Sequence, residues 1–233
     1  MQWLTEEFDD TAFSGRRIVL PTEQFFPDPY DGSEESVRAM LDRVCGYMDV
    51  VPELVDMELV SRASVSNSLG LVNDAGQALG VEVGNYQERY GRFLIRIDSS
   101  QVGNSFELVG TMAHELAHLR LLGEGRIMSE IYDNELLTDL TTVVFGLGIF
   151  RASGTQHWRS NFNSYWPGTT IKKPEYMTGP MYGYALAHLA WFRGEEKPAW
   201  GKHLHLNARP DLRHGIKYLF KTRDSSFRPA RWQ

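Results

Sequence analysis

Apolar residues recur at spacings of three and four along residues 105–122, which is the period of an α-helix. The residues that follow this pattern are Leu108, Val109, Met112, Leu116, Leu119 and Leu122. The segment contains no proline, and the Gly123-Glu124-Gly125 sequence that follows it is a typical helix stop. The pattern therefore predicts a helix of about five turns.

Shorter apolar runs predict strands at 57–61, 78–83 and 92–98, with a hairpin joining the last two. Start and stop signals predict further helices at 33–48, 134–150, 181–194, 198–207 and 211–221. Residues 1–32 indicate an irregular arm, residues 152–180 a polar and aromatic loop, and the chain after Thr222 a basic tail without order. Strands followed by several helices predict an α+β fold.

The first helix carries the run His114-Glu115-Leu116-Ala117-His118, which is the H-E-x-x-H pattern. Residues four apart lie on one face of a helix, so both imidazoles point to one place, as two ligands of one ion must. Glu115 lies about 100° further round the helix and can reach a water bound to that ion. This arrangement of ligands and base is typical of zinc hydrolysis.

A catalytic zinc site needs a third protein ligand. The helix predicted at 134–150 begins with Glu135 and carries Asp139 four residues later on the same face. These two acids are the first choice for completing the site. Two alternatives remain for these residues. The acids could be present only because the helix dipole favours negative charge at a helix start, or Asp133 could be the ligand in place of Glu135.

The spacing from His114 to Asp139 resembles that of the gluzincin zinc metallopeptidases. The resemblance implies that Glu135 is the third zinc ligand and that Asp139 hydrogen-bonds the first histidine and fixes its orientation. It also implies a zincin-like fold, in which a small antiparallel sheet packs on the metal-binding helix and is followed by a mostly helical C-terminal lobe. A downstream tyrosine or histidine that stabilises an oxyanion is a further feature of that family, which makes Tyr184 and His188 candidates. The alternative for both is an aromatic helix face buried in the core.

Two neighbouring families fit less well. Metzincins have a glycine and a third histidine at the places that Leu121 and Glu124 occupy here. Peptide deformylases use a cysteine ligand in an E-G-C motif, whereas Cys45 stands in Arg43-Val44-Cys45-Gly46. His203 and His205 diverge on a helix, which disfavours a second metal site there.

Composition disfavours nucleic-acid-binding, disulfide-bonded, secreted and membrane-spanning classes of protein. A net charge of −6 and a pI of about 5.7 argue against nucleic acid as the main partner. A single cysteine excludes an internal disulfide, and the acidic N-terminus lacks the apolar core of a signal peptide. The longest apolar run, 140–150, is too short to cross a membrane. We therefore expect a cytoplasmic protein without a membrane partner, in an oligomeric state that the sequence leaves open.

These observations lead to one interpretation. The chain is expected to be a single zincin-like domain with an arm at 1–32, an upper lobe at 33–125, a helical lower lobe at 126–222 and a tail at 223–233. Zn²⁺, one per chain, is expected on His114, His118 and Glu135, with Glu115 as general base for hydrolysis of a peptide or protein substrate. Strand 92–98 is expected to pair with an extended substrate. A non-catalytic zinc-binding module and a zinc hydrolase of a non-peptide amide are the alternatives.

Overall fold

The structure is a computed structural model that describes residues 1–8, 15–61, 86–89, 92–128, 134–153 and 176–225. The chain divides into two compact units. Residues Thr22–Gly125 form one, which we call the sheet unit. Met1–Pro21 together with Arg126–Gln233 form the other, the helical unit.

The sheet unit begins with helix α3 (Glu34–Tyr47), at the place that the sequence predicts. The Ser33 hydroxyl oxygen accepts the backbone N–H of Ser36 and caps the helix, and Glu34 and Glu35 lie in its first turn, where the helix dipole favours acids. The buried side chains of α3 follow helical spacing and are Val37, Met40, Leu41, Val44 and Cys45. One apolar face of α3 thus forms part of the core of this unit.

The sheet has three strands in the order β1-β3-β2, which are β1 (Val55–Val60), β2 (Tyr86–Arg89) and β3 (Arg92–Asp98). β1 pairs with β3 in parallel, from Val55 opposite Phe93 to Val60 opposite Asp98, while β2 is antiparallel to β3. The prediction of an antiparallel sheet is therefore wrong for the β1–β3 pair. β3 lies between the two earlier strands, antiparallel to β2 and parallel to β1, and the strand patterns alone do not predict this order.

β3 occupies the range predicted for it, but β2 lies where the sequence suggests only a connecting turn. The predicted strand at 78–83 lies outside the described residues. β3 is the central strand, paired with β1 along its length and with β2 from Arg92 to Ile95. The expectation that it pairs with an extended substrate is therefore wrong for that half of the strand, since both of its edges are already paired.

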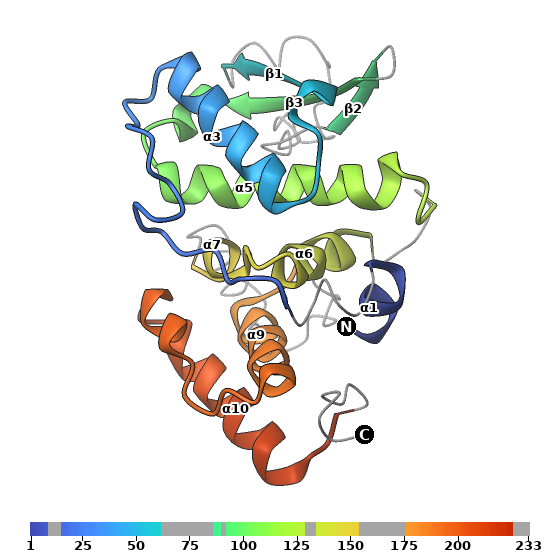
Figure 1. Ribbon diagram of the computed structural model, residues 1–233, viewed down its shortest axis with the longest axis vertical. Coiled ribbons are helices and arrows are strands. Elements are labelled where there is room, and N and C mark those ends of the chain that lie inside the picture. The colour runs from blue at the N-terminus through green and yellow to red at the C-terminus, as the bar shows by residue number, and fades with distance from the viewer. Residues whose placement is uncertain (9–14, 62–85, 90–91, 129–133, 154–175, 226–233) are drawn as a thin grey trace, which may run out of the picture. The chain divides into compact units, whose positions relative to one another are not determined.

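Helix α5 (Ser105–His118) follows β3 after the short 3-10 turn η2 (Ser99–Gln101). The Asn104 side-chain oxygen accepts the N–H of Glu107 and caps its start, and one π-helical turn, η3 (Leu119–Gly123), continues it to the predicted stop. α3 packs against α5, and both lie on the same side of the sheet (Figure 1). The apolar face of α3, the buried residues of α5 and the buried strand residues Ile95 and Ile97 form the core of the sheet unit.

The helical unit begins with helix α1 (Gln2–Phe8), so the expectation of an irregular arm is wrong for this segment. Leu4 and Phe8, four residues apart, are buried, and the Phe8 ring meets the edge of Phe145 with centroids 5.1 Å apart. The signal for this helix is therefore a single i, i+4 apolar pair, which is too short to separate it from an irregular segment.

Two helices occupy the range predicted as one, α6 (Asn134–Val144) and α7 (Gly148–Ala152). The break falls at Gly146, whose φ of +84° is incompatible with a continuing helix. A Cβ at this position would lie 2.4 Å from the carbonyl oxygen of Arg17, and the Gly146 carbonyl accepts the N–H of Val19. The N-terminal segment therefore ends α6 by packing directly on the glycine.

Helices α9 (Gly179–Arg193) and α10 (Arg209–Thr222) form the most extensive helix pair of the unit (Figure 1). Their backbones approach closely at two glycines: a Cβ at Gly183 would lie 2.3 Å from Asp211 Cβ, and a Cβ at Gly215 would lie 2.7 Å from Ala187 Cβ. The short 3-10 helix η5 (Ala199–His203) replaces the predicted helix at 198–207. None of the described helices is long and apolar enough to span a bilayer.

Candidate metal centre

α5 presents both histidines of the H-E-x-x-H run. His114 is 6% exposed and His118 is 8% exposed, on a helix whose other buried residues include Leu108, Met112 and Leu116. An imidazole removed from water in this way needs a partner for its ring nitrogens. The rings of His114 and His118 lie against each other, so they share any such partner.

The Nε2 atoms of His114 and His118 lie 3.2 Å apart, with the ring planes at 89° to each other. Two nitrogens that bind one tetrahedral zinc at 2.0–2.1 Å lie about 3.3 Å from each other. The observed separation therefore fits two ligands of one ion. A hydrogen bond between two neutral rings fits the same distance but uses only one nitrogen as acceptor.

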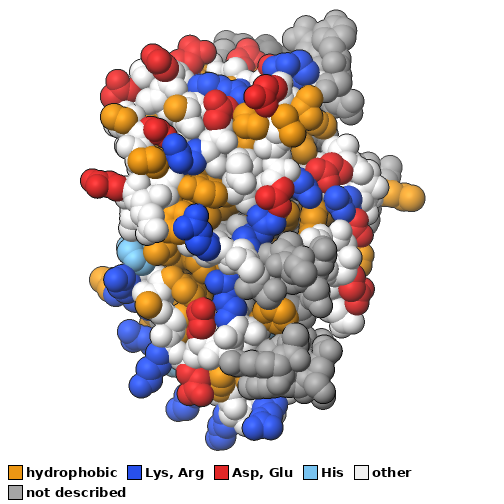
Figure 2. Space-filling view, viewed as in Figure 1, with side chains coloured by type: hydrophobic (Ala, Val, Ile, Leu, Met, Phe, Trp, Pro, Cys, Tyr) orange, Lys and Arg blue, Asp and Glu red, His pale blue; other side chains and the backbone are white. Residues whose placement is uncertain are grey.

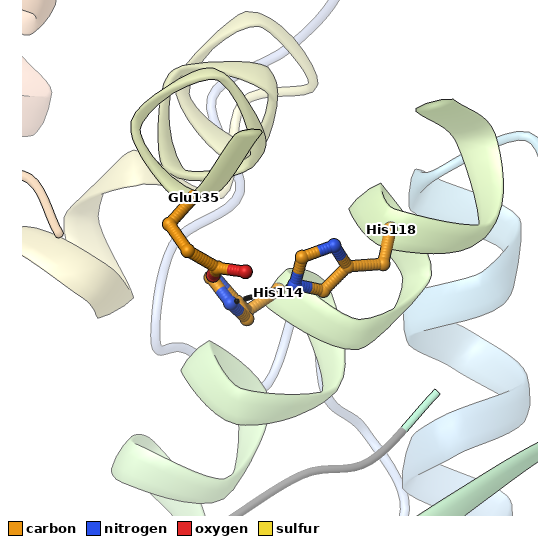
Figure 3. A group of neighbouring side chains, drawn as sticks. All are labelled: His114, His118 and Glu135. Atoms are coloured by element: carbon orange, nitrogen blue, oxygen red, sulfur yellow. Dashed lines mark hydrogen bonds between the residues drawn. The ribbon is translucent and has the colours of Figure 1, made fainter. Parts of the chain in front are cut away.

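Glu135 lies at the start of α6, in the helical unit. Its carboxylate and the ring nitrogens of His114 and His118 all lie within 4.8 Å of one another, and the three side chains point toward one another in Figure 3. This is the one group of three or more histidine, cysteine or acidic side chains at such distances among the residues that the structure describes. α5 and α6 belong to different units, and the role of Glu135 as a zinc ligand stays a prediction.

Glu115 follows the first histidine on α5 and is 4% exposed. Burial of a carboxylate is costly unless the side chain has a partner or a function. A carboxylate shielded from bulk water is suited to accept a proton from a metal-bound water, so the burial is compatible with the predicted role.

Asp139 is completely buried one turn after Glu135, in a network that the sequence does not predict. Its Oδ1 accepts hydrogen bonds from Arg151 Nη2 at 2.7 Å and Arg151 Nε at 3.2 Å, and its Oδ2 accepts the backbone N–H of Met177 at 2.9 Å. Tyr182 also hydrogen-bonds this carboxylate, and burial raises the pKa of its hydroxyl well above the usual value, so the hydroxyl remains a donor. Asp139 therefore joins α6 to α7, α9 and the segment before α9. The predicted hydrogen bond in which Asp139 accepts the ring N–H of His114 stays a prediction.

Replacement of Asp139 by asparagine is expected to destabilise the protein by about 3–5 kcal/mol, because it leaves the Arg151 guanidinium buried without its counter-charge. Urea denaturation of the purified variant measures this effect. Asp42→Asn is the matched control, since Asp42 pairs with Arg38 at the surface and each side chain is about a third or more exposed. The control is expected to lose at most about 1 kcal/mol. Equal stability of the two variants would show that the buried pair contributes no more than a surface pair.

The structure describes Glu124 and Cys45, two of the three other side chains that could act as metal ligands. Glu124 forms an ion pair with Arg120 at 3.2 Å, one turn earlier in η3. Cys45 is buried in α3, and burial raises the pKa of its thiol to about 12, which disfavours the thiolate that binds metal. Asp133 lies outside the described residues.

Tyr184 and His188 both lie on α9, where their rings meet edge to face with centroids 4.6 Å apart. They line an apolar pocket of about 460 Å³ together with Leu136, the residue after Glu135, and Leu140. Burial lowers the pKa of His188 to about 4, so its ring is neutral at pH 7. A neutral imidazole can donate one hydrogen bond to an oxyanion but supplies no charge. Their role as oxyanion stabilisers stays a prediction.

Comparison of the chain with protein-family models, with curated proteins and with solved structures found no match. The resemblance to gluzincins therefore rests on the residues from His114 to Asp139, and the zincin-like fold remains an expectation.

Proposed function

We propose that the chain is a zinc-dependent hydrolase that cleaves peptide bonds. The observation that carries this proposal is the pair of buried imidazole nitrogens 3.2 Å apart on one helix, with a buried glutamate between them in the sequence. A purely structural zinc site has four protein ligands, commonly several cysteines. Here the fitting set is two histidines and one glutamate, which leaves one position for water.

In the proposed reaction His114, His118 and Glu135 hold the ion. Bound Zn²⁺ supplies Lewis acidity that brings the pKa of a coordinated water to about 7. Glu115 accepts the proton of the attacking water and then gives it to the leaving amine. His114, Glu115 and His118 are all buried, and their interactions with the ion and the water would be stronger because less solvent screens them.

The assay is cleavage of a peptide library read by mass spectrometry, with zinc content measured in the same sample. We expect cleavage, its loss on incubation with 1,10-phenanthroline, and its return when Zn²⁺ is restored, since the chelator removes the group that activates water. Ca²⁺ added in place of Zn²⁺ is the control and should not restore cleavage, because it prefers sites built from oxygen ligands.

Two results distinguish the alternatives. A zinc-loaded protein that cleaves no peptide of the library but hydrolyses small acyl amides is a hydrolase of non-peptide substrates. A zinc-loaded protein that cleaves neither is a binding module. Protein purified without chelator that contains no transition metal contradicts all of these readings.

A further inference from the structure

A groove in the helical unit, remote in sequence from the metal-binding residues, is bordered by positive charge. It has a volume of about 830 Å³ and is formed by α10, η5 and the residues just before η5. The cationic side chains that line it are Lys197, Lys202, Arg209, Arg213, Lys217 and Lys221. The last four stand at intervals of four on α10 and therefore follow one side of that helix.

Positive charge is concentrated at this groove although the chain as a whole is acidic. The chain has a net charge of −6 and six lysines in all, and each of the four lysines within the described residues lines this groove. Figure 2 shows Lys and Arg side chains gathered over α10 in the lower part of the view. A cluster of this kind creates a strongly positive local potential on a protein that is otherwise acidic.

The cations have few partners within the protein. Arg209 donates to the carbonyl oxygens of Leu204 and Lys202, which fixes it at the end of η5. Lys197, Lys217 and the other cations of the groove form no ion pair with any carboxylate in the described part of the chain. Glu196 is the one acid on the groove's border. The positive charge is therefore free to pair with a ligand.

The groove also has an apolar floor. Leu212, Ile216 and Phe220 follow the same spacing of four on α10, displaced by one residue from the cations, and Pro198 adds a further apolar side chain to the lining. Phe220 is partly exposed and contacts the edge of the Trp191 ring, which holds it in place. An apolar floor beside a row of cations on α10, with Lys197 and Lys202 also on the lining, favours a ligand with an apolar ridge and acidic flanks.

We propose that this groove binds an acidic amphipathic segment of a partner protein as a helix. Such a segment places apolar side chains every three or four residues along one face and can place carboxylates on both sides of them. A bilayer surface fits less well because it is flat and cannot fill a hollow of this size. A nucleic-acid backbone carries phosphate but no apolar ridge for the floor. The proposal is independent of the hydrolase activity.

The test is the binding of a fluorescein-labelled helical peptide of about 14 residues, with leucines four apart and glutamates on either side of them, measured by fluorescence anisotropy. We expect saturable binding that weakens at least ~10-fold when NaCl rises from about 50 to about 500 mM. Peptides with glutamine for glutamate, or serine for leucine, should each bind at least ~5-fold more weakly. The first lacks the carboxylates that pair with the cations, and the second lacks the side chains that cover the apolar floor.

Protein variants locate the site. Lys217→Glu is expected to weaken peptide binding ~5-fold or more, whereas Arg17→Glu, the same change of charge at an exposed residue outside the groove, should leave it within ~2-fold. Equal effects of the two variants, or binding that ignores the leucines, overturn the proposal in favour of non-specific charge attraction.

Two further results assign the groove to another occupant. If Lys217→Glu abolishes binding to vesicles with about one third phosphatidylserine while the peptide does not bind, the groove serves a membrane surface. If wild type self-associates in sedimentation velocity and Lys217→Glu does not, without binding of the peptide, the occupant is a second copy of this chain. Either result contradicts the proposed partner segment.

Discussion

Glu115→Gln is expected to keep the fold and the bound zinc but to lower turnover by at least ~10²-fold, the low end of a general-base contribution. Glutamine retains the size of the buried side chain and a hydrogen-bonding oxygen, but it cannot accept a proton. Because Glu115 is not one of the three proposed ligands, zinc content should be unchanged. The measurement is the rate of peptide cleavage by wild type and variant at equal zinc occupancy.

A second glutamate on the same helix gives the control. Glu107 lies in the first turn of α5, two turns before the H-E-x-x-H run, and Glu107→Gln makes the same chemical change there. We expect it to cleave peptides at a rate close to that of wild type. If Glu115→Gln is as active as Glu107→Gln, proton transfer by Glu115 is not part of the reaction. The zinc would then have to act with a different base.

The sequence predicts best those features whose causes lie close together in the chain. α3 begins where Ser33 caps it, and α9 ends at Gly194, whose φ of +68° only a residue without a side chain adopts easily. The relation between His114 and His118 is local as well, because the geometry of one helix brings residues four apart together. The prediction of converging imidazoles therefore needs only that the segment is helical, and the Nε2 separation of 3.2 Å confirms that they converge.

Features that depend on distant segments are the ones that the sequence does not predict. α6 ends at Val144, two residues before Gly146, where the backbone of Arg17 packs on the glycine, and the sequence around Gly146 gives no sign of this contact. The parallel pairing of β1 with β3 depends on the path of the chain between them. Arg151 follows Asp139 by 12 residues, across the break between α6 and α7, and the sequence does not indicate that the two side chains pair.

A strong loss of bound metal is expected when either histidine is replaced. His114→Ala and His118→Ala each remove one of the two nitrogens that lie 3.2 Å apart, and the remaining ligands cannot hold a tetrahedral ion tightly. The affinity for zinc should fall by more than the ~10–100-fold that loss of an outer partner causes. Competition with a chromophoric zinc chelator measures the affinity, and circular dichroism establishes that each variant is folded.

Alanine variants of two glutamates, Glu135 and Glu124, identify the third zinc ligand. Glu135→Ala is expected to weaken zinc binding as strongly as the histidine variants, because its carboxylate lies within 4.8 Å of both ring nitrogens and belongs to the ligand type that zinc accepts beside two histidines. Glu124→Ala is the matched control, since Glu124 follows the second histidine on the continuation of α5 but pairs with Arg120. It should keep wild-type affinity. If Glu124→Ala loses zinc and Glu135→Ala does not, the third ligand is the residue that follows η3, in the same unit as the histidines, and the likeness to gluzincins fails at its defining residue.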